Sequence, residues 1–184
     1  ENEQNMSNDI LALGPNQAWF SSDYASKVYY YDNGNITVYR LSENDSISAG
    51  TFYLDEYNNL FVFASDKRFH YFFGNLYIYK FNGNNFSLIN TYKLDYYSAE
   101  SKSHYIWQCG KDAIMLPFTK TQKIYYFNGN DWVYHSNPTD SMVPYKIGGL
   151  SKDSLVALCY PLDDMYTYGG IKWRRENGSP FFIT

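Results

Sequence analysis

The sequence predicts an all-β protein built from four copies of one antiparallel unit. Runs rich in Tyr, Phe, Ile and Val alternate with polar residues and stop at Asn or Gly, which is typical of strands rather than helices. Four times an Asn-Gly pair separates two such runs, and this pair is the strongest short-range signal for a hairpin. The four glycines, Gly34, Gly83, Gly129 and Gly178, lie 49, 46 and 49 residues apart. A fixed period of about 40 to 50 residues is typical of stacked repeats.

The first two copies occupy residues 8–42 and 47–91. In the first, strands are expected at 10–14 and 18–22, followed by the hairpin "VYYYDNGNITVY". In the second, strands are expected at 48–54 and 60–64, followed by the hairpin "YIYKFNGNNFSL". Each copy therefore carries four consecutive strands.

The last two copies occupy residues 104–136 and 145–184. Their first strands are expected within 104–110 and 145–150, and their second strands at 113–118 and 155–160, each pair leading to a hairpin centred on Gly129 or Gly178. An antiparallel unit of four strands and about 45 residues is a propeller blade. We therefore expect residues 1–184 to form a single β-propeller domain of four four-stranded blades, either a closed four-bladed ring or part of a larger propeller.

The aromatic content indicates how the blades pack. Aromatic residues make up 21% of the chain, and 21 residues are Tyr. A single blade cannot cover both of its faces, so neighbouring blades stack and their rings fill the space between them.

Two loops are the best candidates for a binding site. The second and fourth copies are longer than the others between the second strand and the hairpin, and the extra residues fall in 65–75 and 161–170. Loops lengthen where function is added, and in a closed four-bladed ring these two loops would face each other. Their candidate binding residues are Arg68, His70, Tyr71, Asp163, Asp164, Tyr166 and Tyr168. The aromatic run at 69–73 is suited to stacking on sugars or anchoring a protein partner, and equally to folding back into the core.

Arg174 and Arg175 stand where the third strands of the other copies have mostly Tyr. They are candidates for contacting a carboxylate or phosphate. The alternative is that the last blade exposes a face, or contacts a partner, where the other blades are buried.

Signatures of metal or catalytic chemistry are missing from the sequence. His70, His104 and His135 lack the spacing of a zinc site, and Asp163-Asp164 reads as a calcium ligand pair or as a solvated turn. No nucleophile motif is present, so no catalytic residue, metal or cofactor is predicted. Cys109 and Cys159 are expected to be small buried hydrophobes, with a single bridge left open.

Charge and hydropathy limit the partners. The net charge is −4 and no run of Lys and Arg occurs, which argues against nucleic-acid binding. The apolar stretches are too short to insert into a membrane. Glycosylation sequons at Asn5, Asn35, Asn44, Asn85 and Asn177 leave the compartment open and favour an extracellular or cell-surface location.

The segment "NDILALGPNQAWFSSDYASKVYYYDNGN" resembles a bacterial β-propeller repeat in which a strand pair leads to a Tyr-x-x-Asp/Asn-Gly-x-x-Trp hairpin. The likeness extends over nearly the whole chain and more loosely to kelch repeats. Four blades in this length also resemble hemopexin-like domains, although Cys109 and Cys159 do not stand in the first and last blades as those domains require. Propellers host binding modules and enzymes alike.

The expected function is a non-enzymatic recognition or scaffold module that binds a protein or glycan through its loops. One alternative is a propeller-type glycan hydrolase or lyase, and another is a structural subunit of a larger assembly. The chain would act alone, as a homodimer, or as part of a larger propeller.

Overall fold

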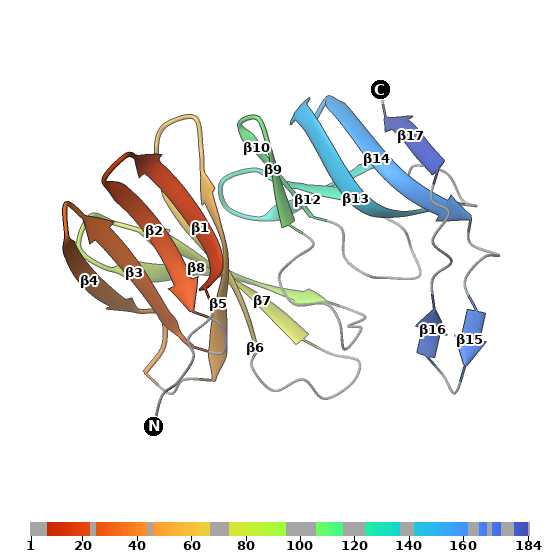
Figure 1. Ribbon diagram of the computed structural model, residues 1–184. Coiled ribbons are helices and arrows are strands. Elements are labelled where there is room, and N and C mark those ends of the chain that lie inside the picture. Colours follow the sequence, from red (N-terminus) through yellow and green to blue (C-terminus); the bar gives the residue numbers. More distant parts are fainter. Residues whose placement is uncertain are drawn as a thin grey trace. The chain divides into compact units, whose positions relative to one another are not determined.

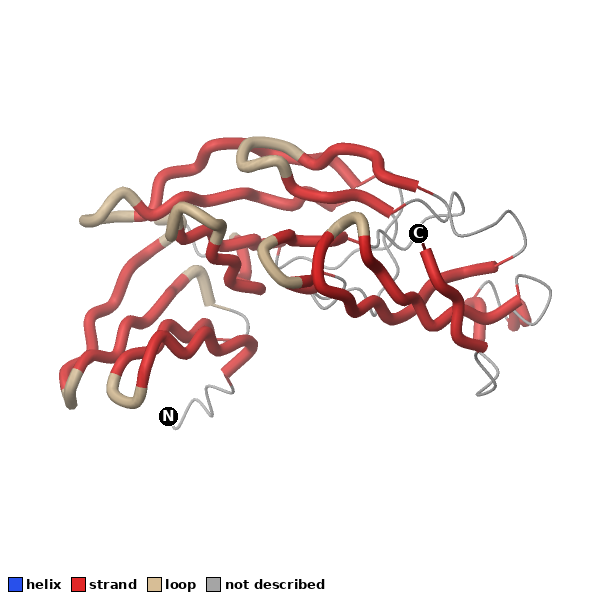
Figure 2. The backbone as a smooth tube through the Cα atoms, turned by 90° about the horizontal axis from the view of Figure 1, so that it is seen from above, coloured by secondary structure: helices blue, strands red, loops and turns tan. Residues whose placement is uncertain are grey.

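The computed structural model describes residues 7–22, 25–43, 46–66, 74–94, 106–115, 124–136, 142–161, 166–168, 171–173 and 179–183. Within these ranges all regular structure is β-strand (Figure 2). None of the described residues forms a helix long and apolar enough to cross a membrane. The chain divides into two compact units, residues 1–104 and 105–184, and each is described by itself.

The first sheet of the first unit has the strand order β1-β2-β3-β4 (Figure 1). Its strands are β1 (Ser7–Gly14), β2 (Gln17–Ser22), β3 (Lys27–Asp32) and β4 (Asn35–Arg40). The pairing Asp32↔Asn35 closes β3 and β4 through a two-residue turn. Asn33 and Gly34 both have positive φ there, 48° and 91°, as a two-residue hairpin turn of this type requires. The predicted first hairpin is confirmed.

The second sheet has the order β5-β6-β7-β8. Its strands are β5 (Ile47–Leu54), β6 (Leu60–Asp66), β7 (Gly74–Phe81) and β8 (Phe86–Leu94). The hairpin between β7 and β8 turns at Gly83, whose φ is 97°. Asn82 Oδ1 accepts hydrogen bonds from the backbone N–H groups of Asn84 and Asn85, at 3.0 and 2.9 Å. The Asn of the repeated motif therefore shapes the turn with its own side chain.

Aromatic rings join these two sheets. Trp19 of β2 is buried, and its ring centroid lies 4.6 Å from that of Tyr30 within the same sheet. It also lies 5.0 Å from Phe81 and 5.6 Å from Phe86 of the second sheet, both in edge-on geometry. Such ring pairs stabilise beyond the area they bury, by about 0.5–1.5 kcal/mol each. The expectation that aromatics pack one copy against the next is confirmed here.

The second unit begins with a four-stranded sheet of order β12-β11-β10-β9. Its strands are β9 (Ile106–Cys109), β10 (Asp112–Met115), β11 (Ile124–Phe127) and β12 (Trp132–Ser136). Its hairpin repeats the geometry of the second one: Asn128 Oδ1 accepts the N–H groups of Asn130 and Asp131, and Gly129 has φ 95°. The third predicted copy is confirmed as a four-stranded antiparallel sheet.

The fourth copy departs from the predicted strand order. Its sheet is β13-β14-β17, made of β13 (Met142–Ser151), β14 (Ser154–Pro161) and β17 (Ser179–Ile183). The strands β15 (Tyr166–Tyr168) and β16 (Ile171–Trp173) pair with each other instead. The residues before Gly178 were expected to pair with the last strand in a hairpin, yet β17 lies directly beside β14. A physical reason is visible in the sequence: Gly169-Gly170 separates Tyr168 from Ile171 by two residues, and this is itself a hairpin signal.

The core of the second unit lies between its two larger sheets. Cys109, Ile114 and Ile124 of the third sheet pack against Leu155 and Ala157 of β14, together with Ile147. Face-to-face packing of successive antiparallel sheets therefore occurs in both units. The single domain, its blade boundaries and the closed four-bladed ring stay predictions.

Candidate functional site

Most of the predicted binding residues lie outside the described part of the chain. These are Arg68, His70, Tyr71, Asp163, Asp164, Arg174 and Arg175. Tyr166 and Tyr168 belong to β15, where their backbones pair with Trp173 and Ile171.

The first candidate loop, 65–75, includes residues 67–73, which lie outside the described part, and the ends of the strands beside it form a polar cluster. Asp66, the last residue of β6, accepts hydrogen bonds at both carboxylate oxygens. The Tyr77 hydroxyl donates to Oδ1 at 2.7 Å, and Asn75 donates its backbone N–H and its side-chain amide to Oδ2, at 3.0 and 3.2 Å. The two ends of the loop are therefore tied together by one carboxylate.

The surroundings of the cluster change the pKa of Tyr77. Partial burial raises the pKa of Tyr77, and the hydrogen bond to Asp66 raises it further, while the contact with Asn75 lowers it. Tyr77 thus stays protonated and keeps donating to Asp66. With both oxygens occupied, Asp66 is suited to holding the loop ends rather than to taking a proton from a substrate.

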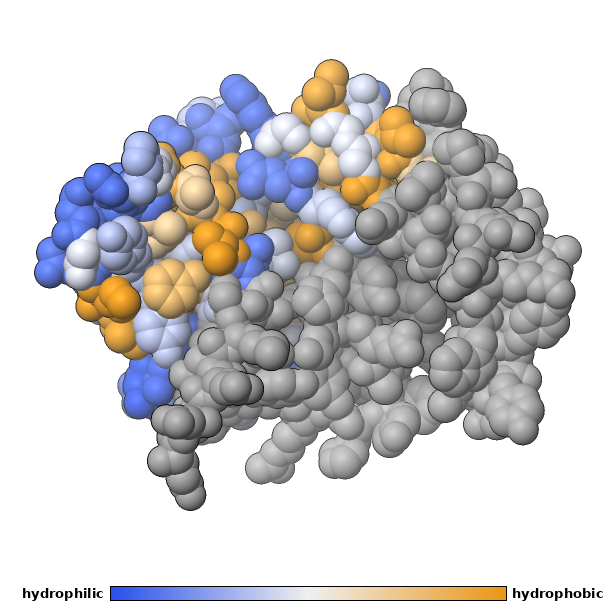
Figure 3. Space-filling model, viewed as in Figure 1, coloured by the Kyte–Doolittle hydropathy of each residue, from blue (hydrophilic) through white to orange (hydrophobic). Residues whose placement is uncertain are grey.

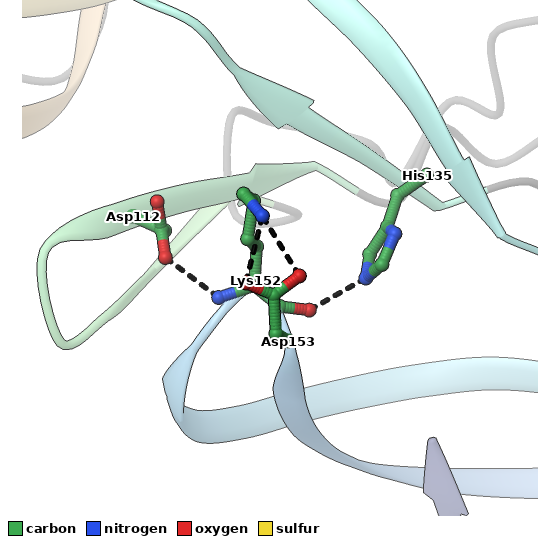
Figure 4. A network of polar contacts seen from close by, with 4 residues as sticks. All are labelled: Asp112, His135, Lys152 and Asp153. Carbon is green, nitrogen blue, oxygen red and sulfur yellow. Dashed lines mark hydrogen bonds and ion pairs between the residues drawn. The ribbon is translucent and has the colours of Figure 1, made fainter. Parts of the chain in front are cut away.

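A second polar cluster lies in the second unit, at the turn between β13 and β14 (Figure 4). Asp112 of β10 accepts the backbone N–H of Lys152 at 2.6 Å. His135 of β12 places Nε2 2.5 Å from the Lys152 carbonyl oxygen. Because a carbonyl only accepts, Nε2 carries the proton. Two side chains of the third sheet therefore hold both backbone groups of one turn residue.

The Lys152 side chain points to its neighbour. Its ammonium lies 2.7 Å from both carboxylate oxygens of Asp153 and 5.6 Å from the centre of the Tyr126 ring. The hydrogen bond to Asp153 raises the pKa of Lys152. This ammonium group is half-exposed and already paired with Asp153. The cluster therefore serves to hold the third sheet and the β13–β14 turn together, through the Lys152 backbone.

The turn is also held by close backbone approach. Gly110, with φ 61°, faces Leu150 so closely that a Cβ there would stand 1.8 Å from the Leu150 carbonyl oxygen. The sequence did not indicate these contacts: His135 was considered only as a possible metal ligand, and Asp112 was not a candidate site residue. The partners of Asp112 and His135 are the backbone N–H and carbonyl of Lys152. Every residue has these backbone groups, so no sequence motif marks the contact.

Metal and thiol chemistry have little support in the described ranges. No group of three or more His, Cys, Asp or Glu there could hold a metal ion. Cys109 is buried and unbridged, as expected for a small hydrophobe. Burial, and to a lesser degree the charge of Asp112, raise the pKa of its thiol to about 11. The side chain of Cys159 lies outside the described part.

Comparison with known proteins shows the fold. No family model matches the chain, and no curated protein matches its sequence. Among solved structures it is similar to virginiamycin B lyase from Staphylococcus aureus, with 14% identity and a TM-score of 0.52 over 85% of this chain and 50% of the lyase. It is also similar to a protein of unknown function from Bacteroides caccae, with 10% identity and a TM-score of 0.50 over 96% and 62%.

The chain spans about half the length of these structures, 50% of the first and 62% of the second. At this level of identity the likeness concerns the fold alone. It confirms the predicted class: the protein is all-β, with antiparallel sheets of the β-propeller type. The expectation that the chain is not an enzyme is corrected, because one of the similar structures is a named enzyme, a lyase. The lack of a catalytic motif in the sequence did not exclude an enzyme, because propeller enzymes can draw their catalytic groups from separate loops.

Proposed function

We propose that the chain is the ligand-binding part of a β-propeller and that it takes an anionic glycan at loop 67–73. The observation that carries the proposal is the cluster at the foot of this loop. Asp66 ties the two ends together through Asn75 and Tyr77. The strands that carry the loop are therefore fixed before a ligand binds, and a preorganised base lowers the entropic cost of binding.

The sequence of the loop sets the ligand class. Residues 67–73 read "KRFHYFF", with two permanent cations, one His, four aromatic rings and no carboxylate. Arg and Lys recognise carboxylates by charge-assisted hydrogen bonds, and aromatic faces suit the apolar faces of sugar rings. Polysaccharides built from uronic acids combine both features. Arg68, His70 and Tyr71 are the proposed contacts.

The second loop, 161–170, is a separate candidate contact for a protein partner. Its candidate residues are two carboxylates, Asp163 and Asp164, and two neutral phenols, Tyr166 and Tyr168, which suit hydroxyl or amide donors rather than carboxylates. Arg174 and Arg175 would offer such a partner a cationic contact. The competing hypotheses on function are a protein ligand and a purely structural role. The kelch-like relationship is a separate hypothesis, on the family of the repeat.

The catalytic form of this proposal is a glycan lyase. In β-elimination a base removes the proton next to the uronate carboxylate, the C4–O bond breaks, and the departing oxygen receives a proton. The products are a shortened chain and an unsaturated sugar, and no water is consumed. Arg68 could neutralise the carboxylate, while His70 and Tyr71 are side chains able to transfer the protons.

Titration with uronate oligosaccharides, with uncharged oligosaccharides of equal length as reference, tests the proposal. We expect only the uronates to bind, and Arg68→Ala to weaken binding about 10- to 100-fold, as loss of a hydrogen bond between charged groups predicts. Arg40→Ala, an exposed cation of β4, is the matched control. Equal binding of both sugars, or equal effects of both variants, would contradict the proposal. Ultraviolet absorbance of the mixture tells a lyase, which forms a conjugated double bond, from a binding module.

A further inference from the structure

Three hairpin turns of the described chain contain the same tripeptide, Asn-Gly-Asn, at residues 33–35, 82–84 and 128–130. All of these residues are exposed, and nothing lies within 4 Å of a Cβ placed on any of the three glycines. Figure 3 shows hydrophilic residues, in blue, at the end of the first sheet where β3 turns into β4 (compare Figure 1). Water and dissolved base therefore reach all three turns. The fourth Asn-Gly pair, at residues 177–178, lies outside the described part of the chain.

An Asn that precedes Gly can lose its side-chain amide to its own backbone. Once a base has removed its proton, the Gly nitrogen attacks the Asn Cγ and forms a cyclic imide, an intramolecular step that the lack of a Gly side chain leaves unhindered. The bond between Cγ and Nδ2 breaks, and the nitrogen takes up a proton and leaves as ammonia. Water then opens the ring at either carbonyl, which gives Asp or isoaspartate. The reaction consumes one water, releases one ammonia and needs no oxidant.

Two of the three Asn side chains, Asn82 and Asn128, are held against this attack. In each, Oδ1 accepts the backbone N–H groups of the second and third residues after it, at 3.0 and 2.9 Å. Such bonds lie near the plane of the carboxamide, whereas the attacking nitrogen must approach its face. The group therefore has to turn away from both donors, and loss of two neutral hydrogen bonds slows such a step by about 5- to 150-fold.

The third side chain, Asn33, has a different partner. Its Nδ2 donates to Asp32 Oδ1 at 2.8 Å, and the same oxygen accepts the side-chain amide of Gln17 at 3.0 Å. No hydrogen bond to Asn33 Oδ1 is found among the described residues. The nitrogen beside Asp32 is the one that leaves, and it becomes cationic as it does so. A carboxylate stabilises the cationic group more than the neutral amide, so Asp32 favours its departure.

We propose that Asn33 is a modification site, which converts to Asp and isoaspartate with water as the co-reactant. Its lead over Asn82 and Asn128 is set by the hydrogen bonds of the three turns, because their exposure and their tripeptide are the same.

The conversion changes the β3–β4 hairpin. Isoaspartate puts an extra carbon into the main chain, inside a two-residue turn whose flanking residues Asp32 and Asn35 pair. The N–H of Asn33 also donates to the Asn16 carbonyl at 3.0 Å, which joins this turn to the β1–β2 turn. Both products place a new carboxylate next to Asp32, and like charges repel. The modified turn is therefore expected to loosen, and the first sheet carries a site that changes with age.

Mass spectrometry of peptides from the aged chain tests the proposal. The chain is kept in mildly alkaline buffer, which supplies the base, and the modified fraction of the three Asn-Gly pairs is followed in one sample. In the folded chain Asn33 should convert at least about fivefold faster than Asn82 and Asn128. In guanidinium chloride the three rates should approach one another. Equal rates in the folded chain, a faster Asn82 or Asn128, or a lead of Asn33 that unfolding does not reduce would each overturn the proposal.

Two variants separate the chemistry from its consequence. Asp32→Asn keeps an acceptor oxygen without the charge and should slow conversion of Asn33 about fivefold, with the rates at Asn82 and Asn128 unchanged. Asn33→Gly accepts the φ of 48° and cannot form the ring, so it is the matched control for ageing. Hydrogen exchange at residues 35–38 should accelerate on ageing in the wild type only. An unchanged rate in Asp32→Asn, or equal acceleration in wild type and Asn33→Gly, would contradict the proposal.

Discussion

Replacing Gly110 by Ala should separate the last sheet from the third. The new Cβ would stand 1.8 Å from the Leu150 carbonyl oxygen and 2.8 Å from its carbonyl carbon, where about 3 Å is the least that real contacts allow. Both are backbone atoms, so no side-chain rotation relieves the overlap. The β13–β14 turn must move away by more than 1 Å.

The cost follows from what the turn would lose. Lys152 is two residues from Leu150, and its backbone N–H and carbonyl are held by Asp112 and His135. A hydrogen bond to a charged group contributes about 1.5–3 kcal/mol and a neutral one about 0.5–1.5 kcal/mol. The left-handed backbone adds about 1 kcal/mol for Ala. We expect Gly110→Ala to lower the free energy of unfolding by about 3–5 kcal/mol, a large share of the stability of a typical domain.

Gly129→Ala is the matched control. Its φ of 95° strains Ala at least as much, yet nothing lies within 4 Å of the added Cβ, so a loss of about 1–2 kcal/mol is expected. Urea unfolding followed by tryptophan fluorescence gives both values, and hydrogen exchange at the Lys152 amide should accelerate only in Gly110→Ala. Equal losses for the two variants would refute the inference that backbone contact fastens these sheets.

Three further outcomes are expected. Tyr77→Phe removes a donor to Asp66 and should lower the free energy of unfolding by about 1 kcal/mol at neutral pH. Because the pKa of Tyr77 is raised in the folded protein, the contribution of its hydroxyl is present below about pH 10 and is lost as pH rises through the raised pKa. The urea midpoints of the wild type and the variant should therefore converge at alkaline pH. Cys109, with a pKa of about 11, should resist thiol reagents at pH 8 until urea unfolds the chain, and rapid native labelling would contradict its burial. Asp9 accepts the backbone N–H of Phe52 at 2.8 Å, so Asp9→Ala should cost about 1–3 kcal/mol while Asp9→Asn, which keeps an acceptor oxygen, costs less; equal losses would mean that this bond does not join the two sheets.

Local turn chemistry is why the first three sheets could be predicted. Asn33-Gly34 requires two positive φ angles, and Asn82 and Asn128 each satisfy two backbone donors of their turn. These interactions lie within four residues, so they can be read from the sequence. The strands on either side then follow from alternation of apolar residues.

The strand order of the fourth sheet could not be predicted, because the sequence offers two hairpin signals there. Gly169-Gly170 and Asn177-Gly178 both predict turns, and only the former has paired strands, β15 and β16, directly on both sides. The choice is settled by β14, which pairs along Leu155–Cys159 with β17. A long-range pairing of this kind leaves no local mark.

The candidate site was predictable only as to place. Loop length indicated 65–75, and the described ends of that loop carry the Asp66 cluster. The fastening by Asp112 and His135 was missed, because backbone partners are not visible in a sequence.

In the first unit, the two four-stranded sheets stack through aromatic rings, with Trp19 of one sheet against Phe81 and Phe86 of the other. Nuclear Overhauser contacts between the Trp19 indole and the ring protons of Phe81 and Phe86 test it most directly, because these residues are far apart in sequence and their ring centroids lie 5.0 and 5.6 Å from that of Trp19. Strong contacts to both rings are the predicted result. Contacts from Trp19 to Tyr30 and Tyr39 of its own sheet alone would contradict the stacking.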